Sequence, residues 1–350
     1  MLGFGIVGCG GAALDVARAI DAVPRARVVA THDRARDHAA DIAASREAAV
    51  HDDLDGLLAD ESVDVVYIGL PHDLLAPTAL RALQTGHHVL VEKPMALRVE
   101  DIASIEDAAR AGERAAGVMF ELREVAAIRV ARDLVGSGAI GDLRQVRIRT
   151  VVDKPASYWQ SGWSGRVVDD WRGRRDRAGG GVLLMNSIHL VDLVRWVTGS
   201  GFARAIGDIA DPPPGVEVED RGGALLRLDG GAQAVLVAHA ASPGASHQER
   251  IEIDGTLGRL DLPDPYTRDP LSAYFRRPWD GYAQDRWHEI ASTPVDPYVA
   301  YLDAFTSAIE AGSDARVGPR DAAAALATIL AIYESSATGR AVDIDPGSAR

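Results

Sequence analysis

Short apolar runs alternate with helix-like patterns through the first 120 residues, and this alternation is the strongest constraint on what the chain can fold into. The strand-like runs cover residues 3–7, 27–31, 63–70, 88–91 and 115–119. The helix-like segments between them cover residues 14–23, 35–44, 74–84 and 99–111. Strands that alternate with helices predict βαβ units and a parallel sheet. We therefore expect residues 1–120 to form a first domain of the α/β class.

After residue 120 the pattern changes to alternating polar and apolar residues, which is typical of antiparallel strands with one wet face. Such strands are predicted at 143–152, 223–228, 232–239, 249–253 and 259–262. Helices are predicted at 128–135, 182–197, 297–311 and 321–338, and irregular segments at 155–180 and 263–297. Residues 121–350 are thus predicted to form an α+β domain with a largely antiparallel sheet, whose last helix can pack back on the first domain.

Length, charge and cysteine content exclude several classes of protein. A chain of 350 residues is long enough for two domains. Its net charge of −14 argues against binding to nucleic acid. No run of about 18 apolar residues predicts a membrane span. A single cysteine, Cys9, cannot form an intrachain disulfide and fits a reducing compartment, so we expect a cytoplasmic protein.

A glycine-rich loop stands between the first predicted strand and the first predicted helix. Gly8 allows a tight turn, and Gly10 lets a pyrophosphate approach the backbone. The following helix would present its free N–H groups to the phosphates. We expect the loop residues Gly8, Cys9, Gly10, Gly11 and Ala12 to bind a dinucleotide. The alternative is a glycine-rich turn without a ligand.

The acidic residue that follows the second predicted strand bears on which dinucleotide is bound. Asp33 stands where a carboxylate accepts hydrogen bonds from a ribose diol and repels a 2′-phosphate, which favours NAD. Arg34 complicates this prediction, because its guanidinium could bind a 2′-phosphate or could be a solvated surface charge. NAD is therefore the expected cofactor, with NADP possible.

Lysine is scarce in this chain, and one of its two lysines ends a strand. Lysine and arginine number 37 together, yet the lysines are Lys93 and Lys154 alone. Lys93 lies in Val-Glu92-Lys93-Pro94 at the carboxyl end of a strand, where ligands of open α/β sheets bind. Proline holds the preceding residue in extended geometry, and a partly desolvated lysine can transfer a proton. The alternative is a surface lysine paired with Glu92.

A second group of polar residues follows the triple glycine at 179–181, which permits a close backbone approach. Asn186, His189 and Asp192 are spaced three apart on a predicted helix that is apolar almost all round. We expect them to share one side of that helix and to bind each other or a ligand. A single buried histidine is more often a core residue than a catalyst, but three polar residues after a triple glycine favour a site.

These motifs, in this order, resemble those of the glucose–fructose oxidoreductase / inositol dehydrogenase (Gfo/Idh/MocA) family over nearly the whole chain. The resemblance includes the closing stretch from Ala331 to Arg340. It implies a Rossmann doubly wound parallel sheet, then an open sheet that covers the site and often pairs subunits into dimers or tetramers. It also implies that Lys93 is the catalytic lysine, with a Lys-Pro bond that is often cis, and that His189 is a general acid/base beside the reacting carbon.

The sequence departs from the family pattern at two positions. The family commonly has an aspartate four residues before the histidine, where this chain has Met185, so Asn186 is expected to act as the hydrogen-bond partner instead. Leu75 stands where the family tends to have a histidine. We therefore expect the cofactor to contact Leu70, Pro71 and His72 or Asp73, besides Glu92 and Lys93.

The resemblance implies an NAD(P)-dependent oxidoreductase that moves hydride between nicotinamide and a sugar, cyclitol or related secondary alcohol. The expected catalytic residues are Lys93, His189 and Asn186. Besides Asn186 and His189, the expected substrate-binding residues are Arg123, Trp163 and Arg172, with Tyr158, Trp159 and Trp171 as weaker candidates. No metal-ligand spacing is present. Two alternatives are an NAD-dependent glycosidase with transient redox and a non-catalytic dinucleotide sensor.

Overall fold

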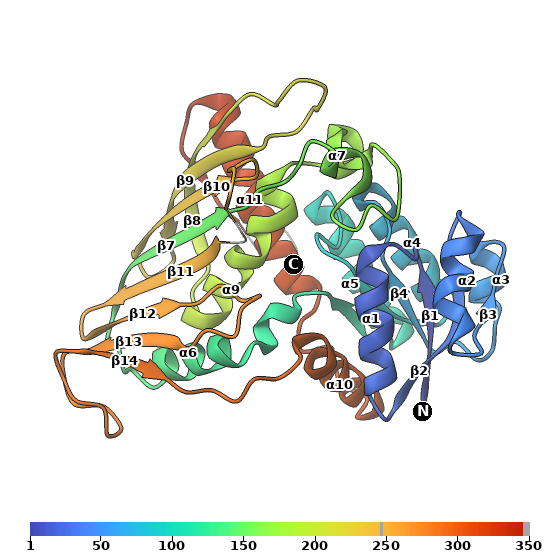
Figure 1. Ribbon diagram of the computed structural model, residues 1–350, viewed down its shortest axis with the longest axis horizontal. Helices are drawn as coiled ribbons and strands as arrows, with labels where there is room; N and C mark the ends of the chain where they lie inside the picture. The colour runs from blue at the N-terminus through green and yellow to red at the C-terminus, as the bar shows by residue number, and fades with distance from the viewer. Residues whose placement is uncertain (246–247, 346–350) are drawn as a thin grey trace.

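The computed structural model describes residues 1–245 and 248–345 and contains two sheets, with helices packed between and around them (Figure 1). The first sheet is built from the N-terminal third of the chain. The second is built from the remainder, and the helices on its inner face lie toward the first sheet. This arrangement confirms the predicted fold class.

The first sheet is parallel throughout and has the strand order β3-β2-β1-β4-β5-β6. Its strands are β1 (Leu2–Val7), β2 (Ala26–His32), β3 (Ala49–Val50), β4 (Val65–Ile68), β5 (His88–Val91) and β6 (Ala116–Val118). Its helices are α1 (Gly11–Ala22), α2 (Arg36–Ala44), α3 (Leu54–Leu58), α4 (His72–Gln84) and α5 (Val99–Gly112). The strand order reverses between β1 and β4, and ligands of doubly wound sheets bind at such a switch point.

The second sheet has the order β14-β13-β12-β11-β7-β10-β9-β8-β15, and only its β7–β10 pair is parallel. Its strands are β7 (Leu143–Val151), β8 (Phe202–Ile209), β9 (Arg221–Leu228), β10 (Gln233–His239), β11 (Gln248–Gly255), β12 (Gly258–Leu262), β13 (Leu271–Phe275), β14 (Trp287–Ile290) and β15 (Val342–Asp343). The longer helices of this half are α6 (Ala126–Gly136), α9 (Ile188–Thr198), α10 (Pro297–Glu310) and α11 (Pro319–Thr338). Short helical turns are η1 (Glu121–Glu124), α7 (Tyr158–Ser161), η2 (Trp171–Gly173), α8 (Arg175–Ala178) and the π-helical η3 (Leu183–Ser187).

One sequence prediction about the second half was wrong, and two strands were missed. The segment 263–297 is not irregular throughout, because β13 and β14 lie within it and extend the sheet. The strands β8 and β15 were not predicted. The helix expected at 182–197 is present, and it consists of the π-helical turn η3 followed directly by the α-helix α9.

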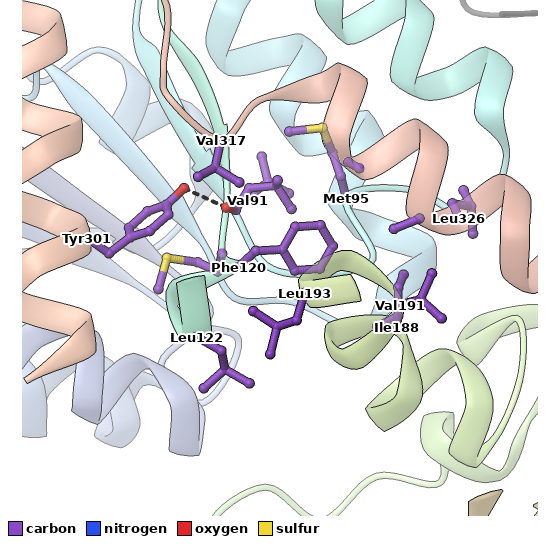
Figure 2. Packing of buried hydrophobic residues seen from close by; sticks show 14 of the residues in the cluster. Val91, Met95, Phe120, Leu122, Ile188, Val191, Leu193, Tyr301, Val317 and Leu326 are labelled. Atoms are coloured by element: carbon purple, nitrogen blue, oxygen red, sulfur yellow. Dashed lines mark hydrogen bonds between the residues drawn. The ribbon is translucent and has the colours of Figure 1, made fainter. Parts of the chain in front are cut away.

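The two C-terminal helices pack back on the first sheet's half. Helix α10 contacts α1, and α11 contacts α5 and β6 as well as β8. The edge strand β6 depends on them: the Val118 N–H donates to the Val317 carbonyl at 3.2 Å, and the Tyr301 hydroxyl donates to the Val118 carbonyl at 2.5 Å. Figure 2 shows the shared core at this junction, where Phe120 lies beside Leu193 of α9 and below Val317.

Close packing in the second half explains two sequence features. A Cβ on Gly181 would lie 1.7 Å from the Glu219 carbonyl oxygen, so only glycine allows this backbone contact. The Ser335 and Ser336 hydroxyls accept hydrogen bonds from the Gly207 and Ile209 N–H groups, which ties α11 to β8. No helix among the described residues is long and apolar enough to cross a membrane.

Candidate active site

A cavity of about 880 Å³ opens at the carboxyl ends of the first sheet's strands and is closed on the other side by the second half. Cavities of this size hold small-molecule ligands and cofactors. Most of the predicted site residues line it: Gly8, Gly10, Gly11, Ala12, Asp33, Arg34, Leu70, Pro71, His72, Glu92, Lys93, Trp163, Arg172, Asn186 and His189. Cys9 and Arg123 do not line the cavity.

The glycine loop makes a tight turn between β1 and α1 at the edge of the cavity. Gly8 has a φ of +85°, and a Cβ there would lie 2.5 Å from the Gly69 carbonyl oxygen. Helix α1 begins at Gly11, has Gly10 as its N-cap and carries no acidic residue in its first turn. Its N-terminal N–H groups are therefore available to an anion, and the positive end of the helix dipole faces the cavity.

Asp33 connects the glycine loop to the end of β2. Its carboxylate accepts a hydrogen bond from the Cys9 N–H at 2.7 Å and another from the Ala35 N–H at 2.8 Å. Each carboxylate oxygen keeps a second lone pair for a ligand. The Cys9 thiol is fully buried, and burial together with the charge of Asp33 raises its pKa to about 12, so Cys9 contributes its backbone and not a nucleophile.

Lys93 lines the cavity and contacts the second half of the chain. The Lys93–Pro94 bond is cis. The Lys93 ammonium donates to the Met185 carbonyl at 2.5 Å, which leaves two of its three N–H donors for other partners. Among the described residues Lys93 forms no ion pair with Glu92, whose carboxylate instead accepts a hydrogen bond from the Tyr67 hydroxyl at 2.9 Å. Lys93 is therefore not the surface ion-pair partner of the alternative interpretation.

His189 is buried beside Lys93, and its Nδ1 atom has no hydrogen-bond partner within the described residues. Burial, with a smaller contribution from the charge of Lys93, lowers the pKa of His189 well below its usual value. The imidazole is therefore neutral. The ring is held edge-to-face against Phe120, with 5.8 Å between ring centroids. The ring of His189 lines the cavity, and its buried Nδ1 atom is left without a protein partner among the described residues.

Of the three polar residues expected to share one side of the helix, Asn186 and His189 line the cavity and Asp192 does not. Asn186 lies in the π-helical turn η3, and His189 and Asp192 lie in α9. Asp192 is instead bound by Arg123, with Nε 2.7 Å from Oδ2. Arg123 is 3% exposed and also contacts Asp321 at 2.8 Å, so its guanidinium is enclosed in ion pairs away from the cavity.

The second lysine of the chain lies in the same region as the first. Lys154 is buried, and its Nζ donates to the Asn186 Oδ1 at 2.5 Å. The Asn186 amide donates in turn to Glu249 Oε1 at 3.3 Å. Burial lowers the pKa of Lys154, and burial raises that of Glu249 to about 7. Asn186 thus joins a buried amine, whose pKa is lowered, to a buried carboxyl that titrates near neutral pH.

Aromatic residues form the roof of the cavity. Tyr158 lies 4.0 Å below the Lys154 Nζ, measured to its ring centroid, and meets Trp163 edge-to-face. The Arg172 guanidinium stacks on Trp171 at 4.5 Å, and its buried Nη1 has no partner within the described part of the chain. Trp159 is buried in the cluster but does not line the cavity. This roof can contact the apolar and hydroxyl faces of a small polar ligand.

His72 is the first residue of α4, and its ring is held by neighbouring groups and does not titrate near neutral pH. Its Nδ1 lies 2.8 Å from the Ala178 carbonyl, and its ring meets Trp171 at 4.7 Å. Burial lowers its pKa to about 3, so the ring is neutral and donates to that carbonyl. Asp73 does not line the cavity, and its carboxylate lies 3.4 Å from Arg177, which does.

Sequence reasoning missed Glu249, Asp169 and Arg166, and it singled out Lys154 without giving it a role. Two signals were present. The scarcity of lysine marked Lys154 as strongly as it marked Lys93. Glu249 shares a strand face with Ile251 and Ile253, and a carboxyl on an otherwise apolar face is unusual. Asp169 and Arg166 lie in a segment of irregular sequence, where no periodicity indicated which side chains face the first half.

Comparisons with known proteins agree with this geometry. Residues 2–120 match the family model described as an oxidoreductase family with an NAD-binding Rossmann fold, and residues 128–261 match the GFO/IDH/MocA C-terminal domain. The chain is 32% identical over 295 residues to 1,5-anhydro-D-fructose reductase of Ensifer adhaerens, covering 83% of each chain. It is 30% identical over 354 residues to D-xylose 1-dehydrogenase (NADP(+)) 2 of Haloferax volcanii, covering 98% of this chain and 99% of that one.

A solved structure is similar over almost the whole length. The structure of GenD2 from gentamicin A biosynthesis in complex with NAD superposes with a TM-score of 0.83 at 26% identity, covering 98% of this chain and 96% of that one. The two matched family models and the relatives lead to one conclusion: the chain belongs to the Gfo/Idh/MocA family of NAD-binding oxidoreductases.

Proposed function

We propose that this oxidoreductase moves hydride between a nicotinamide dinucleotide and a secondary alcohol of a sugar, cyclitol or polyol. The observation that carries the proposal is a single cavity that begins at the glycine loop and ends at Lys93 and His189. The names of the two relatives, a reductase of an anhydro sugar and a dehydrogenase of a sugar, support this substrate class.

The cofactor would be held mainly by the first half. The glycine loop would place the pyrophosphate at the start of α1, through Gly8, Gly10, Gly11 and Ala12. The Asp33 carboxylate would accept hydrogen bonds from the ribose hydroxyls. Leu70, Pro71 and His72 would border the nicotinamide half. When bound, the nicotinamide supplies or accepts hydride.

Lys93 and His189 would handle the substrate oxygen. The two N–H donors of Lys93 that are not bound to the Met185 carbonyl would orient that oxygen. The neutral imidazole of His189 lines the cavity and has a ring nitrogen that can accept a proton. In the oxidising direction the hydroxyl proton would pass to the Lys93–His189 pair, and in the reducing direction it would return from this pair to the carbonyl oxygen.

The first test is a titration with NADH and NADPH, followed by a screen of sugars, cyclitols and polyols for formation of NADH. Lys93→Met should lower kcat by about 10²–10⁴-fold, the usual contribution of a positioned proton-transfer group, with NADH affinity unchanged. The control is Arg98→Met, which removes an exposed cation from the same half. Equal turnover in wild type and Lys93→Met would overturn the role of the lysine.

The same screen separates the two alternatives. An NAD-dependent glycosidase would cleave glycosides without net NADH, and a non-catalytic sensor would bind the dinucleotide but turn over nothing. Lys93, His189 and a complete glycine loop in one cavity support net hydride transfer over both.

We also propose a homodimer or homotetramer formed through the second sheet. Its outer face exposes Ile206, Leu225 and Val237, each at least half exposed, on the adjacent strands β8, β9 and β10. Exposed apolar groups that gather on one face are typical of an interface. Light scattering of wild type and of Leu225→Glu tests this oligomeric state.

We also propose a cytoplasmic location, from the lone buried cysteine, Cys9. Cell fractionation tests it.

A further inference from the structure

A segment of the second half crosses the cofactor edge of the first sheet. We name residues 163–170, between α7 and η2, the strap. Its Ser164 lies so close to the glycine loop that a Cβ on Gly11 would be 2.8 Å from the hydroxyl. Its Arg166 donates to the Cys9 carbonyl at 2.9 Å and forms an ion pair with Asp41 at 2.8 Å. The strap therefore contacts, and is hydrogen-bonded to, the residues expected to surround the dinucleotide.

The strap also carries a carboxylate into that region. Asp169 accepts from Arg34 at 2.7 Å, from Arg177 at 2.8 Å and from the Trp171 N–H at 2.8 Å. The Asp169 side chain is 7% exposed, whereas that of Arg34 is 68% exposed. Asp169 is thus the buried partner of this ion pair, and Arg34 is the exposed one.

Charge balance decides what this arrangement accepts next to Asp33. Asp33, Arg34 and Asp169 all line the cavity. Arg177 neutralises part of the charge of Asp169 but is shared with Asp73 at 3.4 Å. The guanidinium groups of Arg34 and Arg177 are therefore outnumbered by three carboxylates nearby. These are the carboxylates of Asp33, Asp73 and Asp169. A 2′-phosphate would have to compete with Asp169 for Arg34, whereas a ribose diol needs no cation.

We propose that Asp169, contributed by the strap, is a cofactor-specificity residue. Its ion pair with Arg34 makes this guanidinium unavailable to a 2′-phosphate, so the site selects NAD over NADP. This inference rests on the dinucleotide binding in the proposed function. It differs from the role of Asp33, because it acts on Arg34, the cation next to Asp33 in the sequence that could favour NADP.

The test compares the dissociation constants of NADH and NADPH, measured by nicotinamide fluorescence, in wild type and Asp169→Asn. Asparagine can still accept the Trp171 N–H through Oδ1, but it loses the charge that holds Arg34. A guanidinium freed for a phosphate is worth a charge-assisted hydrogen bond, so the NADPH constant should fall roughly 10-fold or more relative to the NADH constant. Wild type should bind NADH more tightly than NADPH.

Two further variants make the result specific. Asp169→Asn combined with Arg34→Gln should lose the gain in NADPH affinity, because the freed cation is gone. Asp41→Asn removes a different carboxylate that fastens the strap through Arg166, and should leave the NADPH-to-NADH ratio unchanged. Together they separate release of Arg34 from a general change in charge or in strap position.

The outcomes are distinct. Tight NADH binding with an unchanged ratio in Asp169→Asn overturns this inference and leaves the proposed function standing. A gain that persists in the double variant overturns it also, since Arg34 would not be the phosphate ligand. Wild type that prefers NADPH overturns the inference directly. Failure of wild type to bind either dinucleotide overturns both the inference and the proposed function.

Discussion

Replacing Asp192 by asparagine should destabilise the fold without weakening the substrate site. The Arg123 and Asp192 side chains are 4% and 1% exposed, and Nε lies 2.7 Å from Oδ2. Breaking one side of a buried ion pair costs about 3–5 kcal/mol, because the remaining charge stays desolvated. Asp321 remains as a second partner, 29% exposed, and keeps part of the interaction. We therefore expect Asp192→Asn to lower the free energy of unfolding by about 3 kcal/mol, the lower end of that range.

Urea unfolding followed by circular dichroism measures this loss, and substrate KM measures the effect on the site. A matched control is Asp107→Asn, the same substitution in an exposed pair with Arg110, which should change stability by less than about 0.5 kcal/mol. The double variant Arg123→Met/Asp192→Leu should recover most of the loss, because both members of the most deeply buried pair become apolar.

The opposite result would refute the reasoning. If Asp192→Asn unfolds at the same urea concentration as wild type while KM rises several-fold, the guanidinium of Arg123 faces the substrate in solution. The sequence expectation of a substrate-binding Arg123 would then hold after all. A loss of stability with unchanged KM assigns this arginine to the fold.

Three further perturbations follow from the geometry. Gly181→Ala would place a Cβ 1.7 Å from the Glu219 carbonyl oxygen. It should lower the free energy of unfolding by at least about 3 kcal/mol, measured by thermal or urea unfolding. An unaltered unfolding curve would contradict the contact. Burial raises the pKa of Glu249 from 4.5 to about 7. The folded state therefore holds this proton to higher pH than the unfolded state, and stability falls as pH rises from 4.5 to 7. Glu249→Gln should flatten that fall, and an unchanged pH profile would count against a buried carboxyl. Lys154→Met removes the amine that holds Asn186 at 2.5 Å and should lower kcat/KM by roughly 10-fold at constant NADH affinity, measured by steady-state kinetics; no loss would make the amine irrelevant to the site.

The first half could be predicted well because local rules decide its structure. A buried parallel strand is a short apolar run and a covering helix is an amphipathic one, so β5 was predicted with its observed bounds and α5 to within one residue. The strand β3 and the helix α3 were missed, because two and five residues are too short to show a period.

The site divides along the same line. The sequence could predict that residues at strand ends and in the glycine loop line one cavity. The reason is that the carboxyl ends of parallel strands meet at one edge of the sheet. The partners of Arg123 and Arg34 were not, because each is contributed by an element distant in sequence: Asp192 and Asp321 to the first, Asp169 to the second. Such pairings depend on how two sheets are placed against each other, and no local pattern encodes this.

The packing of α10 and α11 on the first sheet has a consequence for how the protein is made. The edge strand β6 ends at Val118, yet its hydrogen-bonding partners Tyr301 and Val317 are synthesised almost 200 residues later. At about 5–20 residues per second a ribosome needs roughly 10–40 s to reach them. During that interval the nascent N-terminal half has an uncovered edge and an apolar surface, which is where a chaperone would bind. Truncation before residue 297 should leave that surface permanently open, so the first 120 residues would not be a soluble nucleotide-binding module on their own.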